Sequence, residues 1–286
     1  MSSHDVVAVV RRALRDMKVG HTGTLDPFAT GVLVLLVGRA TRLAQFLADA
    51  EKEYLAGVRL GRATDSYDLT GATTFEVPAD QEWPTIEHVT RLLADMTGPR
   101  MQVPPQFSAK MADGTRAYEQ ARKGIAVDLA PAAVELRQVE ILGLAGTRLD
   151  IRIRCSSGFY VRSLAHDLGA RLGVGAHLEE LRRTKNGTFD AASAITLDLV
   201  PGQGPSLLAR ITPLEALLTD LPAVHLNADG FSYVVHGRDI TPLQAAEQDL
   251  ASGWSGRVRL IGPDGALLAV ADAAPGPVLH PAVVLV

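Results

Sequence analysis

The sequence has 286 residues, of which 47% are hydrophobic and 21% charged, and its formal net charge is −4. This composition supports a sizeable buried core and excludes the disordered, collagen-like and fibrous classes of protein. No apolar run reaches the ~18 residues of a membrane-spanning helix. The only cysteine, Cys155, excludes an internal disulfide and any metal site built from several cysteines. With Asp5 and no basic residue before the first apolar run, the N-terminus does not read as a signal peptide, so we expect a cytoplasmic protein.

The charge is unevenly distributed along the chain. Residues 222–286 hold three basic residues against six acidic ones, and the rest of the chain is close to neutral. A nearly neutral domain can still bind RNA through a basic groove, because phosphate contacts release condensed counterions. Net charge therefore does not exclude a nucleic-acid partner.

The first sixty residues predict two helices, an ordered loop and two strands. Ser3 is predicted to cap a helix whose apolar positions recur at helical spacing. The glycine-rich residues 20–31 are expected to form an ordered loop, and the continuous apolar run 32–37 a strand buried on both faces. Thr41 is predicted to cap a short helix to about residue 50, and residues 53–60 to form the next strand.

The middle of the chain alternates helix and strand signals. A helix is predicted over 86–96, followed by the long, polar and basic segment 102–128. A segment of that length without regular structure is usually functional or mobile. Residues 149–155 alternate apolar and charged side chains, which predicts a half-buried strand, and a helix is predicted over 161–172.

The C-terminal part changes character. Residues 202–205 read as a linker, and a helix is predicted near 213–218. Short apolar runs at 258–261 and 266–270 flank a Pro-Asp-Gly turn and predict a small β-rich module.

Asp26 is the first candidate for chemistry. It precedes Pro27, which keeps its backbone extended, and it lies between glycines that allow another backbone to approach closely. A rigidly held carboxylate with His21 nearby could act as a nucleophile or a general base. The same residues are also typical of an Asp-Pro turn that only fixes a loop.

Four motifs carry a resemblance to a known family. Residues 20–33, GHTGTLDPFATGVL, closely resemble the signature of the tRNA pseudouridine synthases that modify uridine 55, a family shared with the RNA-guided dyskerin enzymes. The other motifs follow in family order: EKEY with LGRATD at 51–54 and 60–65, CSSGFYVR at 155–162, and GVGAHLEELRRT at 173–184. The similarity covers roughly residues 1–200.

The resemblance implies roles for particular residues. Asp26 would attack the flipped uridine at the base or at the ribose, and Arg162 would pair with Asp26 and keep it ionised. Tyr54 would stack on the target base or serve as general base. Leu181 would line the pocket, and His21 would help to hold the base flipped. Without the motifs, Tyr54 and Leu181 would be read as core residues and Arg162 as a solvated charge.

The resemblance also implies how RNA is held. Residues 102–128 resemble the insertion that bacterial members fold over the T-arm, and their aromatic and basic side chains suit stacking and phosphate contact. The remaining predicted substrate contacts are Tyr160, Lys110, Arg122, Arg182 and Arg183.

The fold implied is α/β (α+β). A synthase domain with a central mixed, mainly antiparallel sheet is expected over 1–215, and a small PUA-like β-barrel over 221–286. The expected partner is the T-arm of tRNA, with no cofactor, no metal, no membrane and no obligatory protein partner, and the expected state is a monomer. Family members carry a strand and a Lys-Pro-x-Gly element before the first helix. This sequence begins inside that stretch, which indicates either a misassigned start or an impaired protein, and we favour the misassigned start.

Three other readings remain open. An RNA-guided enzyme of dyskerin type predicts a short segment in place of 102–128. A tRNA-binding or folding factor would use the same scaffold without catalysis. A glycoside hydrolase would need a second positioned carboxylate, and the sequence places none convincingly.

Overall fold

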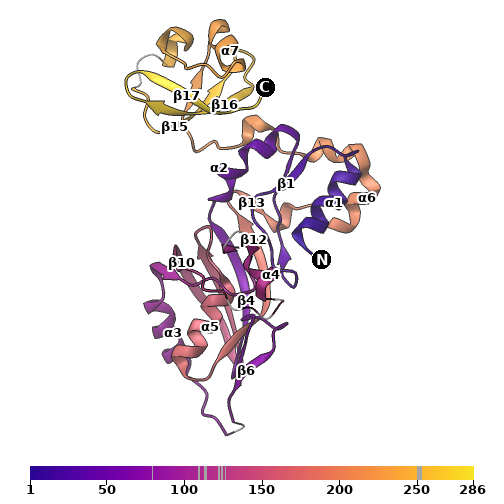
Figure 1. The fold of residues 1–286 in the computed structure, drawn as a ribbon, viewed down its shortest axis with the longest axis vertical. Helices are drawn as coiled ribbons and strands as arrows, with labels where there is room; N and C mark the ends of the chain where they lie inside the picture. Colours follow the sequence, from indigo (N-terminus) through magenta and orange to yellow (C-terminus); the bar gives the residue numbers. More distant parts are fainter. Residues whose placement is uncertain are drawn as a thin grey trace. The chain divides into compact units, whose positions relative to one another are not determined.

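The computed structural model describes residues 1–78, 80–108, 110–112, 115–121, 123, 125, 127–249 and 253–286. Its contacts divide the chain into two units (Figure 1). The first unit comprises Met1 and residues 25–33 and 49–194, and the second comprises residues 2–24, 34–48 and 195–286. The predicted domain boundary near 215–221 falls inside the second unit and stays a prediction.

A seven-stranded sheet forms the centre of the first unit. Its strand order is β13-β12-β4-β11-β10-β7, with β2 added beside β12. Every pair is antiparallel except β2 with β12, which is parallel. The expected mixed, mainly antiparallel sheet is thereby confirmed. The strands are β2 (Thr30–Gly31), β4 (Lys52–Leu60), β7 (Gly98–Gln102), β10 (Ala132–Ala145), β11 (Arg148–Cys155), β12 (Ala176–Asn186) and β13 (Phe189–Asp190).

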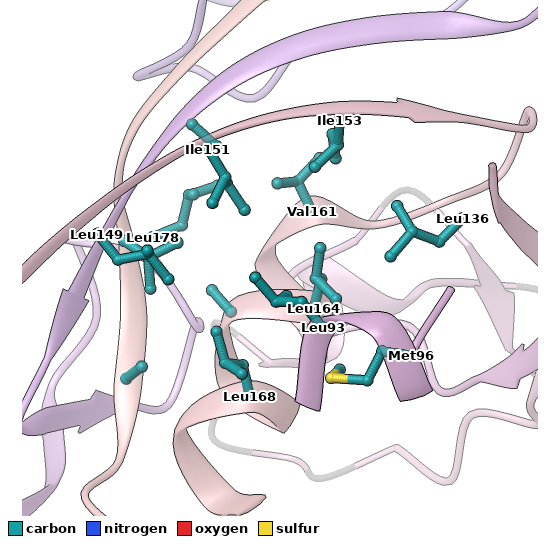
Figure 2. Close-up of a cluster of buried hydrophobic side chains, with 14 of the residues drawn as sticks. Leu93, Met96, Leu136, Leu149, Ile151, Ile153, Val161, Leu164, Leu168 and Leu178 are labelled. Atoms are coloured by element: carbon teal, nitrogen blue, oxygen red, sulfur yellow. The ribbon is translucent and has the colours of Figure 1, made fainter. Parts of the chain in front are cut away.

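Among the residues that the structure describes, apolar side chains bury one face of β11, as its alternation predicts. Ile151 and Ile153 are buried at 1% and 0% exposure, whereas Arg148 and Arg152 lie on the other face and pair with Glu180 and Glu140. Helices α3 (Ile86–Asp95) and α5 (Val161–Leu172) contribute to the same buried cluster as the apolar strand residues. Figure 2 shows their side chains directed at those of the strands. An antiparallel sheet with one solvated face has this pattern.

The predicted boundaries of these two helices are confirmed. The hydroxyl of Thr85 caps α3 by accepting a hydrogen bond from the His88 N–H. Helix α5 ends at Gly173, whose φ of 73° is left-handed and therefore favours glycine. The smaller elements of this unit are β5 (Arg62–Thr64), β6 (Thr73–Glu76), β8 (Met111–Ala112), β9 (Thr115–Arg116) and α4 (Ala117–Ala121).

The strand predicted over 32–37 is confirmed only in its second half. Strand β3 (Leu35–Val37) lies in the second unit, where it pairs with β1 (Val19–His21), whereas Val32 follows β2 in the first unit. The Val32 N–H donates to the Arg183 carbonyl of β12, so the two halves of the run bond to different strands. A continuous apolar run does not reveal such a divergence, because each half satisfies its burial separately.

The predicted caps near the N-terminus are also corrected. Helix α1 (Ser3–Ala13) is capped by Ser2, whose hydroxyl accepts from the Asp5 N–H. Thr41 lies inside a 3₁₀ helix (Gly38–Leu43) that precedes α2 (Ala44–Ala48), and its hydroxyl donates to the Gly38 carbonyl.

The predicted linker at 202–205 is helical. It lies in α6 (Val200–Gln203) and a 3₁₀ helix (Gly204–Arg210), and Val200 and Leu207 pack with Val10 and Leu14 of the α1 segment. Its glycines and proline suggested a linker, but the buried residues beside them decide the structure. Further 3₁₀ turns cover Ala191–Ser193, Leu197–Leu199, Leu214–Ala216, Pro242–Gln244 and Glu247–Asp249.

The C-terminal residues form the expected small β module. Its sheet has the order β14 (Ala223–His225), β15 (Arg257–Ile261), β16 (Leu267–Ala274) and β17 (Val278–Val284), and α7 (Ala228–Val235) shares its core. In the part of the chain that the structure describes, no helix is long and apolar enough to cross a membrane.

Candidate active site

The loop that carries Asp26 is fixed to the central sheet immediately after the carboxylate. The Ala29 N–H donates to the Asp26 carbonyl at 2.9 Å and closes a turn around the Asp-Pro pair. Gly31 then pairs with Arg183 of β12 at a φ of 103°. A Cβ at this position would collide with the Arg183 carbonyl, so the close approach requires glycine. The position of the carboxylate is therefore set by a short, anchored loop.

Arg162 binds the Asp26 carboxylate through both of its oxygens. Nε donates to Oδ2 and Nη2 to Oδ1, each at 2.8 Å. Arg162 is the second residue of α5, and its side chain is 4% exposed, against 28% for Asp26. A two-point pair of this kind fixes the orientation of both planes. The carboxylate is thus held at a fixed angle while part of its surface stays exposed.

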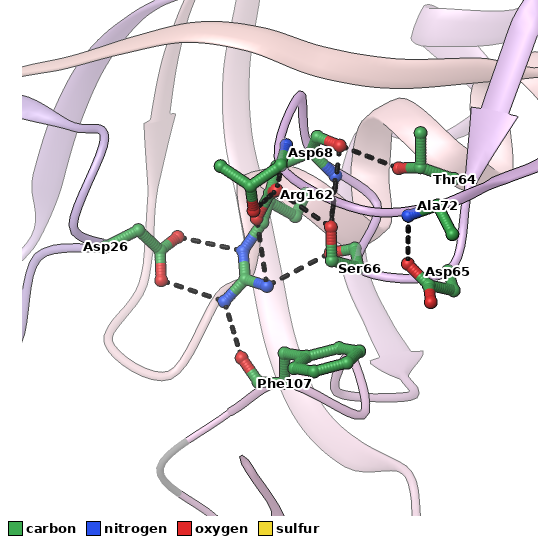
Figure 3. Close-up of polar contacts among 9 residues, drawn as sticks. Asp26, Thr64, Asp65, Ser66, Asp68, Ala72, Phe107 and Arg162 are labelled. Carbon is green, nitrogen blue, oxygen red and sulfur yellow. Dashed lines mark hydrogen bonds and ion pairs between the residues drawn. The ribbon is translucent and has the colours of Figure 1, made fainter. Parts of the chain in front are cut away.

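The rest of the Arg162 guanidinium is also paired (Figure 3). Nη1 donates to the Ser66 carbonyl at 3.1 Å, and Nη2 donates to the Phe107 carbonyl at 3.0 Å. Nη1 also lies 3.5 Å from the Asp68 carboxylate. A buried cation shared by two carboxylates and two carbonyls has its charge and donors satisfied, so removing it would leave several buried acceptors unpaired.

Asp68 is a site residue that the sequence analysis missed. It is 5% exposed, and its Oδ1 accepts from the Ser66 hydroxyl at 2.8 Å and from the Thr70 N–H and hydroxyl at 2.9 and 2.6 Å. A side chain on Gly71 would collide with Ser66, so this turn also needs glycine. The signal was present in the sequence: four Asp, Ser or Thr side chains follow β5 in a segment ending in glycine.

The environment of Asp26 sets its protonation behaviour. Burial raises the pKa of the Asp26 carboxyl above its ordinary value, the Arg162 guanidinium opposes the rise, and the Asp68 carboxylate adds to it. Asp26 is thus a fixed, partly exposed carboxylate with a cation beside it. It can act as a nucleophile or stabilise positive charge on a ligand.

Tyr54 lies on β4 with its ring buried at 9% exposure. Burial raises the pKa of Tyr54 to about 12, the Arg183 guanidinium opposes the rise, and the Asp26 charge contributes to it. The side chain is therefore the neutral phenol near pH 7, which favours stacking and hydrogen bonding over general-base action. Leu181 of β12 is 7% exposed and belongs to the same buried cluster.

Tyr160 is held at the start of α5 by the insertion. The side chain of Gln102 accepts from the Tyr160 N–H at 2.8 Å and donates to its carbonyl at 3.0 Å. The Ser163 hydroxyl donates to the Val103 carbonyl at 2.8 Å. The first residues of the predicted RNA-binding segment are thus tied to the helix that carries Arg162.

The basic residues predicted to contact RNA differ in their exposure to solvent. Lys110 and Arg182 are exposed. Arg183 is 1% exposed, and its Nε donates to the Val32 carbonyl at 2.8 Å, so its side chain anchors the loop and does not face the surface. Arg122 lies outside the described residues, and His21 lies in the second unit on β1.

Among the described residues, no group of His, Cys, Asp and Glu side chains could hold a metal ion.

Comparison with known families identifies two matching regions. Residues 11–161 match the N-terminal domain of the TruB family pseudouridylate synthases, and residues 162–219 match the tRNA pseudouridylate synthase B C-terminal domain. A relative from Solibacter usitatus, named tRNA pseudouridine synthase B, is 41% identical over 99% of this chain and 96% of its own. One of the same name from Thermobifida fusca is 44% identical over 95% of this chain and 90% of its own.

Two solved structures share the fold of this chain. A chain from an H/ACA ribonucleoprotein bound to a substrate RNA containing 2′-deoxyuridine superposes with a TM-score of 0.71 and 26% identity, over 100% of this chain and 82% of its own. A chain from the archaeal box H/ACA Nop10–Cbf5 complex gives a TM-score of 0.72 and 25% identity, over 100% and 83%.

Proposed function

The chain belongs to the TruB family of pseudouridylate synthases and is therefore an isomerase, and we propose that it converts uridine 55 in the T-arm loop of tRNA to pseudouridine. The observation that carries this proposal is the Asp26 carboxylate, bound at both oxygens by the buried Arg162. Relatives about 40% identical over nearly the whole chain are named as tRNA enzymes, which supports tRNA as the substrate.

The reaction begins with extrusion of the uridine. A base inside the T-loop is stacked, and unstacking it costs a few kcal/mol. Asp26 then attacks the nucleotide at the base or at the ribose, and the bond from N1 of uracil to the ribose breaks. The base rotates and its C5 bonds to the ribose, the bond between Asp26 and the nucleotide breaks, and the proton lost from C5 is balanced by one gained at N1. Positive charge that develops on the ribose is matched by the carboxylate. Because the product is an isomer of the substrate, the balance requires no oxidant or nucleotide cofactor.

The side chains around Asp26 support this step. Arg162 keeps the carboxylate ionised and holds its plane. Tyr54 stacks as the neutral phenol on the flipped base, consistent with its raised pKa. Leu181 closes the apolar side of the pocket and excludes water. His21 and Tyr160 hold the extruded nucleotide.

Phosphate contacts supply much of the affinity for tRNA. Lys110 and Arg182 are exposed and charged, and we assign them to the backbone of the T-arm together with Arg122 of the insertion. Counterion release predicts that neutralising one of these side chains makes the slope of log affinity against log salt concentration shallower by about one. We further propose that the protein acts as a cytoplasmic monomer without an obligatory protein partner.

Unmodified tRNA transcripts test the position and the independence from a guide. The wild-type protein, supplied with transcript alone, should modify a tRNA carrying uridine 55 and leave unmodified a transcript with cytidine at that position. Base-specific chemical probing with primer extension locates the product. Modification elsewhere, or activity only after a guide RNA is added, would exclude this assignment. In assays of Asp26 variants, Asp95→Asn is the matched control, because it changes an exposed aspartate of α3.

A further inference from the structure

Residues 66–68 contact α5 at two successive turns of the helix. Arg162 and His166 lie four residues apart on the helix, so they share one face. Ser66 and Asp68 contact Arg162. Between them, the ring of Tyr67 stacks on the ring of His166, with centroids 3.8 Å apart and planes at 16°. The segment therefore grips the helix at Arg162 and one turn further along.

The backbone of Tyr67 is held in a conformation that its side chain disfavours. Its φ is +63°, in the left-handed region where a bulky residue is a genuine outlier. The Tyr67 carbonyl accepts from the Leu178 N–H at 2.9 Å, and the Leu69 N–H donates to the Leu178 carbonyl at 2.9 Å. Hydrogen bonds to Leu178 of the central sheet and stacking on His166 thus both hold the Tyr67 backbone in this conformation.

The imidazole of His166 contacts Tyr67 through its ring face and does not act as a positive charge. Within the described residues its Nδ1 is buried and has no hydrogen-bond partner, which is an unfavourable state for a ring nitrogen. Burial also lowers the pKa of His166, against the Asp167 charge, so the ring is neutral near pH 7. The strained backbone of Tyr67 and the unpaired ring nitrogen of His166 thus belong to the same contact. This contact lies one helical turn from Arg162, which binds Asp26. Strain concentrated in this way is characteristic of functional sites.

We propose that Tyr67 and His166 are positioning residues for the isomerisation. Their stacked rings hold the Ser66 carbonyl and the Asp68 carboxylate against Arg162, and Arg162 in turn sets the angle of the Asp26 carboxylate. This inference rests on the proposed roles of Asp26 and Arg162. Neither ring is assigned a contact with the nucleotide, so their loss should affect the chemical step and leave tRNA binding in place.

The test compares two substitutions at one position. Tyr67→Asn removes the ring but accepts the left-handed backbone, and Tyr67→Phe keeps the ring. Single-turnover conversion of a tRNA transcript should slow about tenfold in Tyr67→Asn, with the Kd for tRNA unchanged within twofold, and Tyr67→Phe should restore most of the rate. A tenfold change corresponds to about 1.4 kcal/mol. An unchanged rate in Tyr67→Asn, or an equal loss in Tyr67→Phe, would overturn the proposal.

A second substitution separates positioning from simple destabilisation. In an Asp68→Asn background the link to Arg162 is already weakened, so adding Tyr67→Asn should cost less than about threefold in rate. A full tenfold further loss at a temperature where both proteins are folded contradicts action through Asp68. Wild type and Asp26→Asn are run alongside. If wild type is active, Asp26→Asn inactive and Tyr67→Asn unchanged, only this inference fails; an inactive wild type or an active Asp26→Asn removes the proposed function itself.

Discussion

Replacing Arg162 by lysine keeps the positive charge beside Asp26 but removes the planar fork. The guanidinium makes two hydrogen bonds to the Asp26 carboxylate and one each to the Ser66 and Phe107 carbonyls, all at 2.8–3.1 Å. A lysine ammonium has three donors on one atom and cannot reach acceptors spread around a plane. At least two of these hydrogen bonds cannot form, and each involves a charged group and contributes about 1.5–3 kcal/mol. We expect a total loss of about 3–6 kcal/mol, divided between the folded state and the transition state.

Two assays separate these contributions. If half of the loss falls on the chemical step, the single-turnover rate should drop roughly 10- to 10²-fold, and the free energy of unfolding in urea should fall by about 1.5–3 kcal/mol. Arg171→Lys is the matched control, because Arg171 lies on the same helix and is exposed. An Arg162→Lys rate within threefold of wild type would show that charge alone, and not the two-point geometry, holds Asp26.

Three further outcomes follow from the same geometry. Since burial raises the pKa of Asp26 and the reaction needs its ionised form, the single-turnover rate should fall as the pH drops through a midpoint above about 3.9; a midpoint at or below that value contradicts the assignment. Gly31→Ala should destabilise the protein to urea by more than Gly146→Ala does, because both glycines have positive φ but only a Cβ at Gly31 meets the Arg183 carbonyl; equal losses would remove the close approach as the cause. Cys155 is 1% exposed and burial raises its pKa to about 12, so a thiol reagent at pH 8 should label the native protein at least ~10²-fold more slowly than the denatured one, and equal rates would refute the buried position.

Elements with one clear period were predictable from the sequence. Strand β11 alternates apolar and charged residues because one of its faces meets α3 and α5, and α5 ends where a left-handed glycine follows. The run 32–37 was not predictable, because its two halves pair with different segments, and local hydrophobicity carries no information about a partner far along the chain.

The candidate site shows the same limit. The motifs indicated Asp26 and Arg162 as a pair, and the structure brings these side chains together. Asp68 and the stacked Tyr67 and His166 were missed, because their importance depends on which turn of α5 the segment faces. Arg183 was predicted to contact phosphate from its charge, but its position directly opposite Tyr54 on a central strand places it in the core. Charge type alone does not tell which side of a strand a residue occupies.

Tritium release from a tRNA transcript labelled at C5 of uracil is the most direct test of Asp26 as the catalytic carboxylate. Wild type and Asp26→Ala are compared under single turnover, with tRNA binding measured on both. Release by wild type, and none above background by an Asp26→Ala protein that still binds tRNA, is the predicted result. Release by Asp26→Ala at a rate near that of wild type would contradict the central role of this carboxylate.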